Sequence, residues 1–421
     1  PAVRPSHMSR RRAIVLIAVH LLIIGHVVHW LVAGTTLSPV EPSEAMYALN
    51  NGYINAGAIF FAVTIASTLV LGRLFCGWAC HLVALQDLCR WLLLKAGMRP
   101  QPLESRLLRW VPFLAFAYMF LWPIVFRFRS GGSFTTVHLE LTTDQFWATF
   151  PGWIVGISTF LICGFLIVYL LGSKGFCTYA CPYGAAFILA DRFALRRIRV
   201  TDACQGCGHC TATCSSNVRV HEQVRDFGMV VDDGCLKTLD CVSVCPNDAL
   251  YYGRGISRRQ ALTEASVPWY RRSPLSWGEE LVLGLGFVAS FVTFRGLYGV
   301  VPFLLSLGLS AVLAYLVLTT VRLATRPNLA LRQFRLKSQG RLQPAGRVYL
   351  GLMVLLLAAW AHSAVVQYHQ IRGEHDFRQT APIRRELLDI TRVVASLDSA
   401  QTTRVRRSLD HLEAADRLGL M

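Results

Sequence analysis

Apolar runs long enough to cross a bilayer recur along the chain and are separated by shorter polar segments. A spanning helix needs about 20 predominantly apolar residues, and seven runs reach or approach that length. These runs are residues 13–33, 54–71, 110–126, 153–171, 281–294, 300–321 and 348–366. The fifth run is short, and we expect it to extend through Trp277 and to join the sixth by a hairpin at 295–299. The pattern predicts an all-α integral membrane protein with about seven transmembrane helices.

A cysteine-rich stretch interrupts this pattern between the fourth and fifth runs, and a polar tail follows the seventh. We expect four segments: helices one to four in 1–199, an inserted small α+β domain in 200–256, helices five to seven in 257–368, and an amphipathic helical tail in 369–421. Apolar residues recur at helical spacing in two parts of the tail, from 383 to 394 and from 405 to 418. Such spacing is typical of a face that packs on a partner or a membrane surface.

The distribution of positive charge predicts the topology. With seven crossings, the segments on the same side of the membrane as the N-terminus contain 30 Lys and Arg residues. The loops on the other side contain 3. By the positive-inside rule the N-terminus and the cysteine-rich domain are cytoplasmic, in a multi-pass protein of the bacterial inner membrane. A formal charge of +17 is also found in nucleic-acid-binding proteins. We reject this function because the arginines flank apolar segments and form no stripe among exposed aromatic residues.

The inserted domain contains seven cysteines in two interlocking runs. They are Cys204, Cys207, Cys210 and Cys214 in the first run, and Cys235, Cys241 and Cys245 in the second. The C-x2-C-x2-C-x3-C spacing and the closing C-P dipeptide are those of a bacterial two-cluster ferredoxin, in which the fourth cysteine of each run ligates the other cluster. Cys204, Cys207, Cys210 and Cys245 are therefore assigned to one [4Fe-4S] cluster. Cys214, Cys235 and Cys241 remain for a second.

The second site is one thiolate short, because Thr238 occupies the position of the missing cysteine. Three outcomes stay open: a [3Fe-4S] cluster, a [4Fe-4S] cluster with a non-cysteine ligand, or a lost cluster. Four-cysteine sites also bind zinc, but seven cysteines in ferredoxin spacing favour iron-sulfur chemistry. His209, between two of the cysteines, is expected to be exposed.

A second repeat lies in the first half of the chain, where two runs at the ends of helices two and four read F-C-x-x-A-C. They place Cys76 with Cys80, and Cys177 with Cys181. Residues four apart share a helix face, so each pair could point two thiols the same way at the cytoplasmic membrane surface. Two hairpins related by a pseudo-two-fold axis would bring the pairs together as a third redox centre, an iron-sulfur cluster or a dithiol. The alternative is that these small side chains only permit tight helix packing.

With these paired motifs and a ferredoxin module on one face, the chain resembles the NapH-type membrane polyferredoxins over roughly residues 10 to 255. That group includes quinol dehydrogenase subunits of periplasmic reductases and the membrane iron-sulfur regulator of nitrous oxide reduction. The resemblance implies quinol oxidation and electron delivery to a redox partner. The chain departs from the family pattern at His81, where the motif has proline, and at Thr238.

Ionisable residues within or beside a span are candidates for function. His26 and His29 lie near the outer end of helix one, and His362 lies in the outer part of helix seven. They are candidates to bind a quinone headgroup or a haem, and the alternative is interfacial histidines bonded to backbone or water. Glu41 and Glu44, in the loop after helix one, are candidate acceptors of quinol protons, although a solvated loop also carries such residues without a function.

We therefore expect a membrane-bound iron-sulfur protein that takes electrons from quinol and passes them through ferredoxin clusters to another redox subunit. No G-x-G-x-x-G turn is present, so NAD or flavin would belong to another subunit. The alternative is an assembly or maturation factor that reduces a metal or a thiol during oxidoreductase biogenesis. The cysteine motifs fit both functions.

Overall fold

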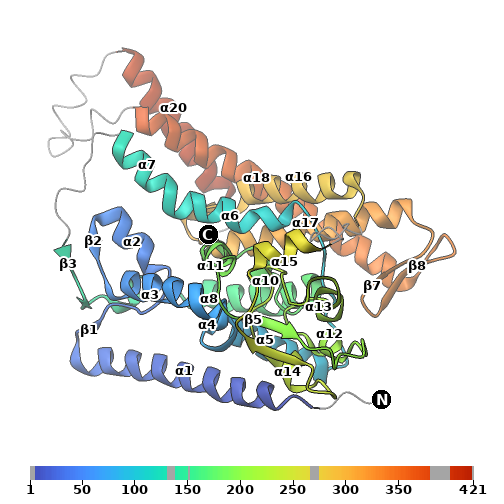
Figure 1. The fold of residues 1–421 in the computed structure, drawn as a ribbon. Helices are drawn as coiled ribbons and strands as arrows, with labels where there is room; N and C mark the ends of the chain where they lie inside the picture. The colour runs from blue at the N-terminus through green and yellow to red at the C-terminus, as the bar shows by residue number, and fades with distance from the viewer. Residues whose placement is uncertain (1–4, 130–137, 150–151, 266–274, 380–398, 420–421) are drawn as a thin grey trace. The chain divides into compact units, whose positions relative to one another are not determined.

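The computed structural model describes residues 5–129, 138–149, 152–265, 275–379 and 399–419 (Figure 1). It divides the chain into two compact units, Pro1–Glu280 and Leu281–Met421. The ferredoxin segment does not form a unit of its own. It belongs to the first unit together with the first four predicted membrane helices, which means that its loops and those helices share one packed body.

Among the described residues, six helices are long and apolar enough to cross a membrane. They are α1 (His7–Ala33), the continuous helices Leu108–Arg129 and Trp153–Leu171, α16 (Trp277–Phe294), α17 (Phe303–Thr325) and the first 35 residues of α18 (Pro344–Gln379). A seventh apolar helix, α3 (Ala56–Leu71), has 16 residues. Each predicted apolar run is thus helical, and the fifth begins at Trp277 as expected. A total of seven crossings remains a prediction.

Two of the long helices change their winding at mid-length. The helix Leu108–Arg129 consists of η1 (Leu108–Trp110), α6 (Val111–Phe116), the π-helical η2 (Ala117–Leu121) and α7 (Trp122–Arg129). The helix Trp153–Leu171 consists of α8 (Trp153–Thr159), the π-helical η4 (Phe160–Leu166) and α9 (Ile167–Leu171). Turns of π-helix are rare and are often found near functional sites.

The repeat predicted from the F-C-x-x-A-C motifs is visible in the backbone. After α3 the chain forms a short helix α4 (Leu74–Trp78) and then α5 (His81–Lys95); after α9 it forms α10 (Gly175–Tyr179) and then α11 (Pro182–Asp191). Gly72 and Gly172 end the preceding helices with φ of 60° and 104°. A Cβ at Gly72 would lie 2.6 Å from Asp191 Oδ1, and one at Gly172 would lie 2.8 Å from Pro102 Cα. Both turns therefore require glycine.

The ferredoxin segment is a two-stranded antiparallel sheet with short helices. Strand β5 (Arg197–Val200) pairs with β6 (Leu250–Gly253), so the expected α+β character is present. The helices are α12 (His209–Thr213), α13 (Val220–Phe227), α14 (Asp240–Ser243) and α15 (Arg258–Glu264). Five of the seven cysteines pack with the strands and α13 in one apolar core, either buried within it or against its edge.

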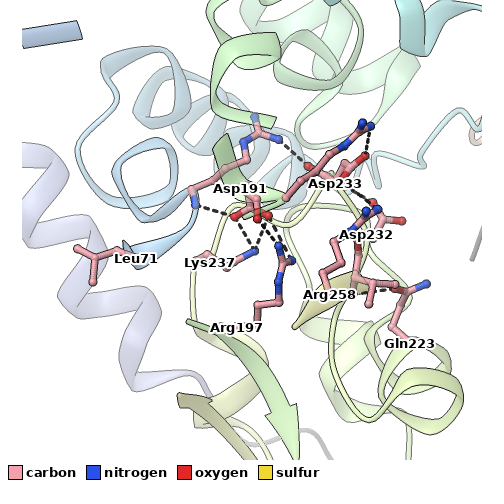
Figure 2. A network of polar contacts seen from close by, with 12 residues as sticks. Leu71, Asp191, Arg197, Gln223, Asp232, Asp233, Lys237 and Arg258 are labelled. Atoms are coloured by element: carbon pink, nitrogen blue, oxygen red, sulfur yellow. Dashed lines mark hydrogen bonds and ion pairs between the residues drawn. The ribbon is translucent and has the colours of Figure 1, made fainter. Parts of the chain in front are cut away.

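A buried ionic network joins this segment to the membrane hairpins (Figure 2). Asp191, at the end of α11, lies 3.1 Å from Lys237 Nζ and 3.4 Å from Arg197 Nη1. Its Oδ1 also accepts a hydrogen bond of 3.0 Å from the Arg73 backbone N–H, at the start of α4. Lys237 is 0% exposed and belongs to the loop that carries the second set of cysteines. One carboxylate thus connects both membrane repeats to the ferredoxin loops.

The outer loops of the first unit form small elements at the far end of α1. Strand β1 (Thr36–Leu37) pairs with β4 (Thr142–Thr143), and β2 (Tyr53–Ile54) pairs with β3 (His138–Leu139). Helix α2 (Glu44–Asn51) and η3 (Phe146–Thr149) complete this region. These pairings hold the loop after α1 against the loop that precedes α8.

In the second unit, α16 and α17 are joined at η5 (Leu297–Gly299), as the predicted hairpin requires. A three-stranded sheet that the sequence did not indicate follows α17, with β7 (Leu329–Leu331), β8 (Phe334–Ser338) and β9 (Arg341–Leu342) in that order. Helix α18 continues to Gln379, past residue 368, where the last membrane helix was expected to end. The end of the membrane segment itself stays a prediction.

The end of the tail forms α20 (Ser399–Leu418), which packs along α18 (Figure 1). Ser408 Oγ donates a hydrogen bond of 2.8 Å to the Gly373 carbonyl, and the Nδ1 atoms of His369 and His411 are 2.9 Å apart. Of the apolar face predicted for 405–418, Leu412 lies near Gly373, but Leu409 and Leu418 are 53% and 40% exposed, so this face packs on the chain only in part. The face predicted for 383–394 lies outside the described residues.

We predict that Asp191→Asn destabilises the first unit strongly. The change leaves Lys237 and Arg197 buried without their carboxylate, and breaking a buried pair in this way costs about 3–5 kcal/mol. The measurement is the denaturation midpoint of the full chain in detergent. Asp226→Asn, which breaks an exposed pair with Arg225, is the matched control and should cost less than about 1 kcal/mol.

The same pair of variants gives a pH test. Burial by itself raises the pKa of Asp191, but Lys237, Arg197 and Arg73 together hold this pKa below its usual value. The stabilisation is therefore complete above the unfolded-state pKa of about 4 and is lost as the pH falls below it. The difference between wild type and Asp191→Asn should be constant from about pH 5 to 8 and shrink only in acid. A difference that shrinks near neutral pH would contradict this role.

Candidate iron-sulfur and thiol sites

The four cysteines assigned to the first cluster line one pocket. Cys204, Cys207, Cys210 and Cys245 are in its wall, together with Pro246. Cys204 and Cys207 are exposed on a loop with left-handed glycines at 206 and 208, and Cys210 is buried in the first turn of α12. Four thiols from two loops around one pocket fit the donor set of a [4Fe-4S] cluster. His209 was expected to be exposed, and this is wrong, because it is buried beside Cys210 in α12.

The three cysteines left for the second cluster also gather. Cys214, Cys235 and Cys241 belong to one apolar core, and the Cys241 thiol interacts electrostatically with the other two. Burial raises the pKa of Cys214 to about 12, with a further contribution from Cys235. Burial thus opposes deprotonation of Cys214 and Cys241 when no metal is bound, and binding of iron would displace their protons. Among the described residues, no group of three or more His, Cys, Asp or Glu side chains is arranged to hold a single metal ion.

Thr238 lies where the ferredoxin loop meets the first membrane motif. A Cβ at Gly77 would lie 2.2 Å from the Leu236 carbonyl oxygen and 3.5 Å from Thr238 Cγ2. The Trp78 indole N–H donates a hydrogen bond of 3.0 Å to the Lys237 carbonyl. The loop that carries the incomplete cysteine set is thus packed directly on the residues between Cys76 and Cys80.

The two membrane motifs bring their four thiols into one group. The Cys80 thiol interacts with Cys177 and Cys76, and the Cys181 thiol interacts with Cys177, Cys80 and Cys76. Cys76, Cys177 and Cys181 are buried, and Cys80 is partly buried. The two motifs therefore lie near one another, and a shared redox centre formed by the four thiols stays a prediction.

The local geometry of the motifs differs from the expected single helix. Cys76 and Cys177 lie in the five-residue helices α4 and α10, whereas Cys80 and Cys181 lie beyond the ends of these helices and precede the first residues of α5 and α11. The two cysteines of each pair are thus separated by a break between two helices.

Charged side chains that the sequence did not single out surround the four thiols. The Gln86 amide donates a hydrogen bond of 3.0 Å to Cys177 Sγ, which links the first repeat to the second. Lys174 Nζ lies 2.5 Å from Asp87 Oδ1, and Arg12 Nη1 lies 2.6 Å from Asp87 Oδ2. Lys174 is almost fully buried in the turn before α10. In the sequence, these residues are seen only as charges near a cysteine motif. Such charges are too common to predict that they would lie beside the four thiols.

The four-thiol group lies beside α1. Arg12 of α1 contacts Asp87 and Asp240, and His20 interacts with His81, the residue after Cys80. Eight residues of helix separate Arg12 from His20, which is about 12 Å. The first motif and the helix that follows it therefore lie along this length of α1.

The loop after α1 approaches the second repeat. Glu41 interacts electrostatically with Tyr183, two residues after Cys181, and Ser43 forms a hydrogen bond with the Tyr183 hydroxyl. Glu44 is 4% exposed, and its carboxylate accepts a hydrogen bond of 3.2 Å from the Asn55 amide. Glu44 is therefore not solvated, whereas Glu41 is half-buried. A function of either glutamate as a proton acceptor stays a prediction.

The candidate quinone or haem histidines belong to different units. His26 Nε2 lies 3.0 Å from the Leu37 carbonyl, and His29 Nδ1 lies 2.9 Å from Thr36 Oγ1. Each ring thus has one nitrogen bonded to the strand that follows α1, as interfacial histidines would. His362 belongs to α18 in the second unit. Binding of haem or quinone by these residues remains a prediction.

Comparison with known proteins identifies a matching domain and several relatives. Residues 55–99 and 145–201 match the model of a 4Fe-4S binding domain, and these two segments contain the two membrane motifs. Ferredoxin-type protein NapH of Haemophilus influenzae is 28% identical over 197 residues, which are 44% of this chain and 63% of that protein. The chain is therefore similar to NapH-type ferredoxin proteins, and these likenesses indicate a membrane iron-sulfur protein of ferredoxin type.

Other relatives of the chain carry different names. The methylamine utilization ferredoxin-type protein MauN of Methylobacillus flagellatus is 26% identical over 222 residues, 49% of this chain and 75% of that protein. Regulatory protein NosR of Stutzerimonas stutzeri is 27% identical over 204 residues, 45% of this chain and 26% of that protein. No solved structure matches the chain. The matches cover about half of this chain at most, so the partners of the relatives cannot be transferred directly.

We predict that Thr238→Cys completes the second cluster site. The added thiol supplies the missing ligand, so the iron content should rise by about one atom per chain as a [3Fe-4S] cluster becomes a cubane. Iron analysis and EPR of the purified protein measure this. Thr201→Cys, which adds an exposed thiol in the same domain, is the control and should change neither. Unchanged iron and an unchanged spectrum in Thr238→Cys would rule out a vacant ligand position at residue 238.

Proposed function

We propose that this protein oxidises a membrane quinol and delivers the electrons to a separate redox subunit. Cys204, Cys207, Cys210 and Cys245 would hold one [4Fe-4S] cluster, and Cys214, Cys235 and Cys241 a second of [3Fe-4S] type or with a non-cysteine ligand. These clusters supply one-electron storage when bound. The four thiols of the membrane motifs would form a third redox centre. The names of the relatives, which include two ferredoxin-type proteins, support an electron-transfer function.

The observation that carries this proposal is the contact between the ferredoxin loop and the first motif. The Leu236 carbonyl packs against Gly77, and the Lys237 carbonyl is hydrogen-bonded to Trp78. A loop of cluster ligands is thereby fixed next to a group of four thiols. A protein that needed its motifs only for helix packing would have no reason to bring the two cysteine groups together.

Proton release would accompany the electron transfer, because oxidation of a quinol yields two electrons and two protons. Glu41 packs beside Tyr183 and His81, which lie directly after the two motifs. The loop that carries this carboxylate continues from α1 at the outer end of the membrane layer. Glu41 is therefore our candidate for the first proton acceptor, while Glu44 is engaged with Asn55 and has a positioning role.

The first test is reduction of the iron-sulfur chromophore by quinol in purified membranes. Bleaching by quinol supports the proposal. Reduction only by a soluble cytoplasmic donor, without any response to quinol, would favour an assembly or maturation factor that reduces a metal or thiol during oxidoreductase biogenesis. Replacing Cys76 and Cys177 with serine should abolish the quinol response while dithionite still reduces the ferredoxin clusters.

We predict that Gly77→Ala slows quinol-driven reduction several-fold and leaves reduction by dithionite unchanged. The added Cβ would lie 2.2 Å from the Leu236 carbonyl oxygen, so the ferredoxin loop must move away from the motif. Stopped-flow bleaching in membranes measures both rates. Gly156→Ala, where a Cβ meets nothing within 4 Å, is the matched control and should behave as wild type. Equal rates of quinol-driven reduction in both variants would show that electron transfer does not depend on this loop contact.

The proposal includes a topology in the bacterial inner membrane with the ferredoxin domain in the cytoplasm. We predict that alkaline phosphatase fused after Ser257 is inactive and that green fluorescent protein fused there is fluorescent. Fusions after Leu139, in the opposite loops, should give the reverse pattern. The charge asymmetry is the physical reason. An active phosphatase after Ser257 would show that the ferredoxin domain lies on the opposite side of the membrane.

A further inference from the structure

A large cavity lies where the membrane repeats meet the ferredoxin loops, apart from the cysteine pocket. Its volume is about 760 Å³, within the range typical of small-molecule sites. Three segments of the first unit line it: residues 102–113 around the start of a spanning helix, residues 174–192 of the second repeat, and residues 216–236 of the ferredoxin segment. Trp277, at the start of α16, completes the wall.

The cavity carries an excess of positive charge. Its basic residues are Arg73, Arg106, Arg109, Lys174, Arg192 and Arg219, and its acidic residues are Glu104, Asp232 and Asp233. Arg192 pairs with Asp233 and Arg219 with Glu104, both at 3.1 Å. The Arg106 guanidinium lies 4.8 Å above the Trp277 ring. Neither Arg106 nor Arg109 forms a salt bridge with a carboxylate in the described part of the chain.

A second observation concerns Arg73, which also lines the cavity. Arg73 is 3% exposed, and its Nε has no hydrogen-bond partner among the described residues, although Nη1 donates to the Asp233 carbonyl at 2.7 Å. A buried guanidinium N–H without an acceptor costs free energy unless an acceptor binds. Arg73 thus retains one N–H donor that an anion in the cavity could use.

The lining also includes apolar and aromatic residues. Trp110 and Trp277, each the first or nearly the first residue of a candidate spanning helix, are 62% and 68% exposed. Leu189 and Phe113 also line the cavity. Exposed tryptophans at helix ends are typical of the membrane interface, where their rings contact both headgroups and acyl chains. The cavity therefore combines basic residues with aromatic residues that are typical of this interface.

We propose that this cavity binds the headgroup of an anionic phospholipid. Its phosphate would be held by Arg106 and Arg109, with its acyl chains along Trp110 and Leu189. Basic pockets beside membrane helices on the cytoplasmic side bind such headgroups. Because the lining includes both the membrane repeats and residues 216–236, the bound lipid would hold the ferredoxin loops against the membrane motifs. The proposal does not depend on quinol oxidation.

The test measures lipid binding to the full chain in detergent by native mass spectrometry, with phosphatidylglycerol and phosphatidylcholine as probes. We expect wild type to prefer phosphatidylglycerol, and Arg106→Gln with Arg109→Gln to weaken that binding about tenfold or more, since each basic residue near a surface contributes roughly 1 kcal/mol. Arg10→Gln with Arg11→Gln removes the same charge from the exposed start of α1 and should leave the binding within about twofold of wild type. Arg106→Lys with Arg109→Lys keeps both charges and should retain most of the phosphatidylglycerol binding.

Each other outcome overturns the proposal. Equal binding of the two lipids, or equal loss in both glutamine variants, would show only general attraction to the surface. Competition by inorganic phosphate that does not depend on acyl chains would indicate a free-anion site. Displacement of the bound lipid by quinol, with no effect of the arginine variants, would assign the cavity to quinol. The absorbance of the iron-sulfur chromophore in every variant checks that the protein is folded.

Discussion

The arrangement of the first unit depends on a buried carboxylate. Asp191 ends the second membrane repeat, binds the backbone at the start of the first motif and pairs with Lys237 of the ferredoxin loop (Figure 2). A buried charge needs a partner, and the partners of Asp191 come from the first motif and from the ferredoxin segment. The glycine at position 72 leaves the space for this contact. A second buried ion pair, between Arg12 and Asp240, also joins α1 to the ferredoxin segment.

Around this anchor the chain places its cysteines in three neighbouring groups. The first lines a pocket in the ferredoxin segment, the second lies in its apolar core, and the third is formed by the two membrane motifs. The contact of Leu236 with Gly77 links the second group to the third. Thr238 sits at this junction, so the departure from the ferredoxin pattern occurs where the loop packs on the membrane part.

The third group also meets elements from both ends of α1. Arg12 and Asp87 lie on its ferredoxin side, and Glu41 approaches Tyr183 from the outer loop. Residues beside the thiols of the membrane motifs are thus contacted from both ends of this helix. The basic cavity includes Cys177 in its lining and lies beside this group.

The sequence by itself determined the apolar helices, the ferredoxin segment and the repeated motif, because each depends on local spacing of residues along the chain. The extent of α18, the burial of Glu44 and the position of the first motif beside α1 were decided by tertiary structure. The reason is that a break between two helices within a motif changes where its side chains point without changing their spacing. Partners such as Lys237 and Asp191 are 46 residues apart, and only packing of the two segments brings their charges together.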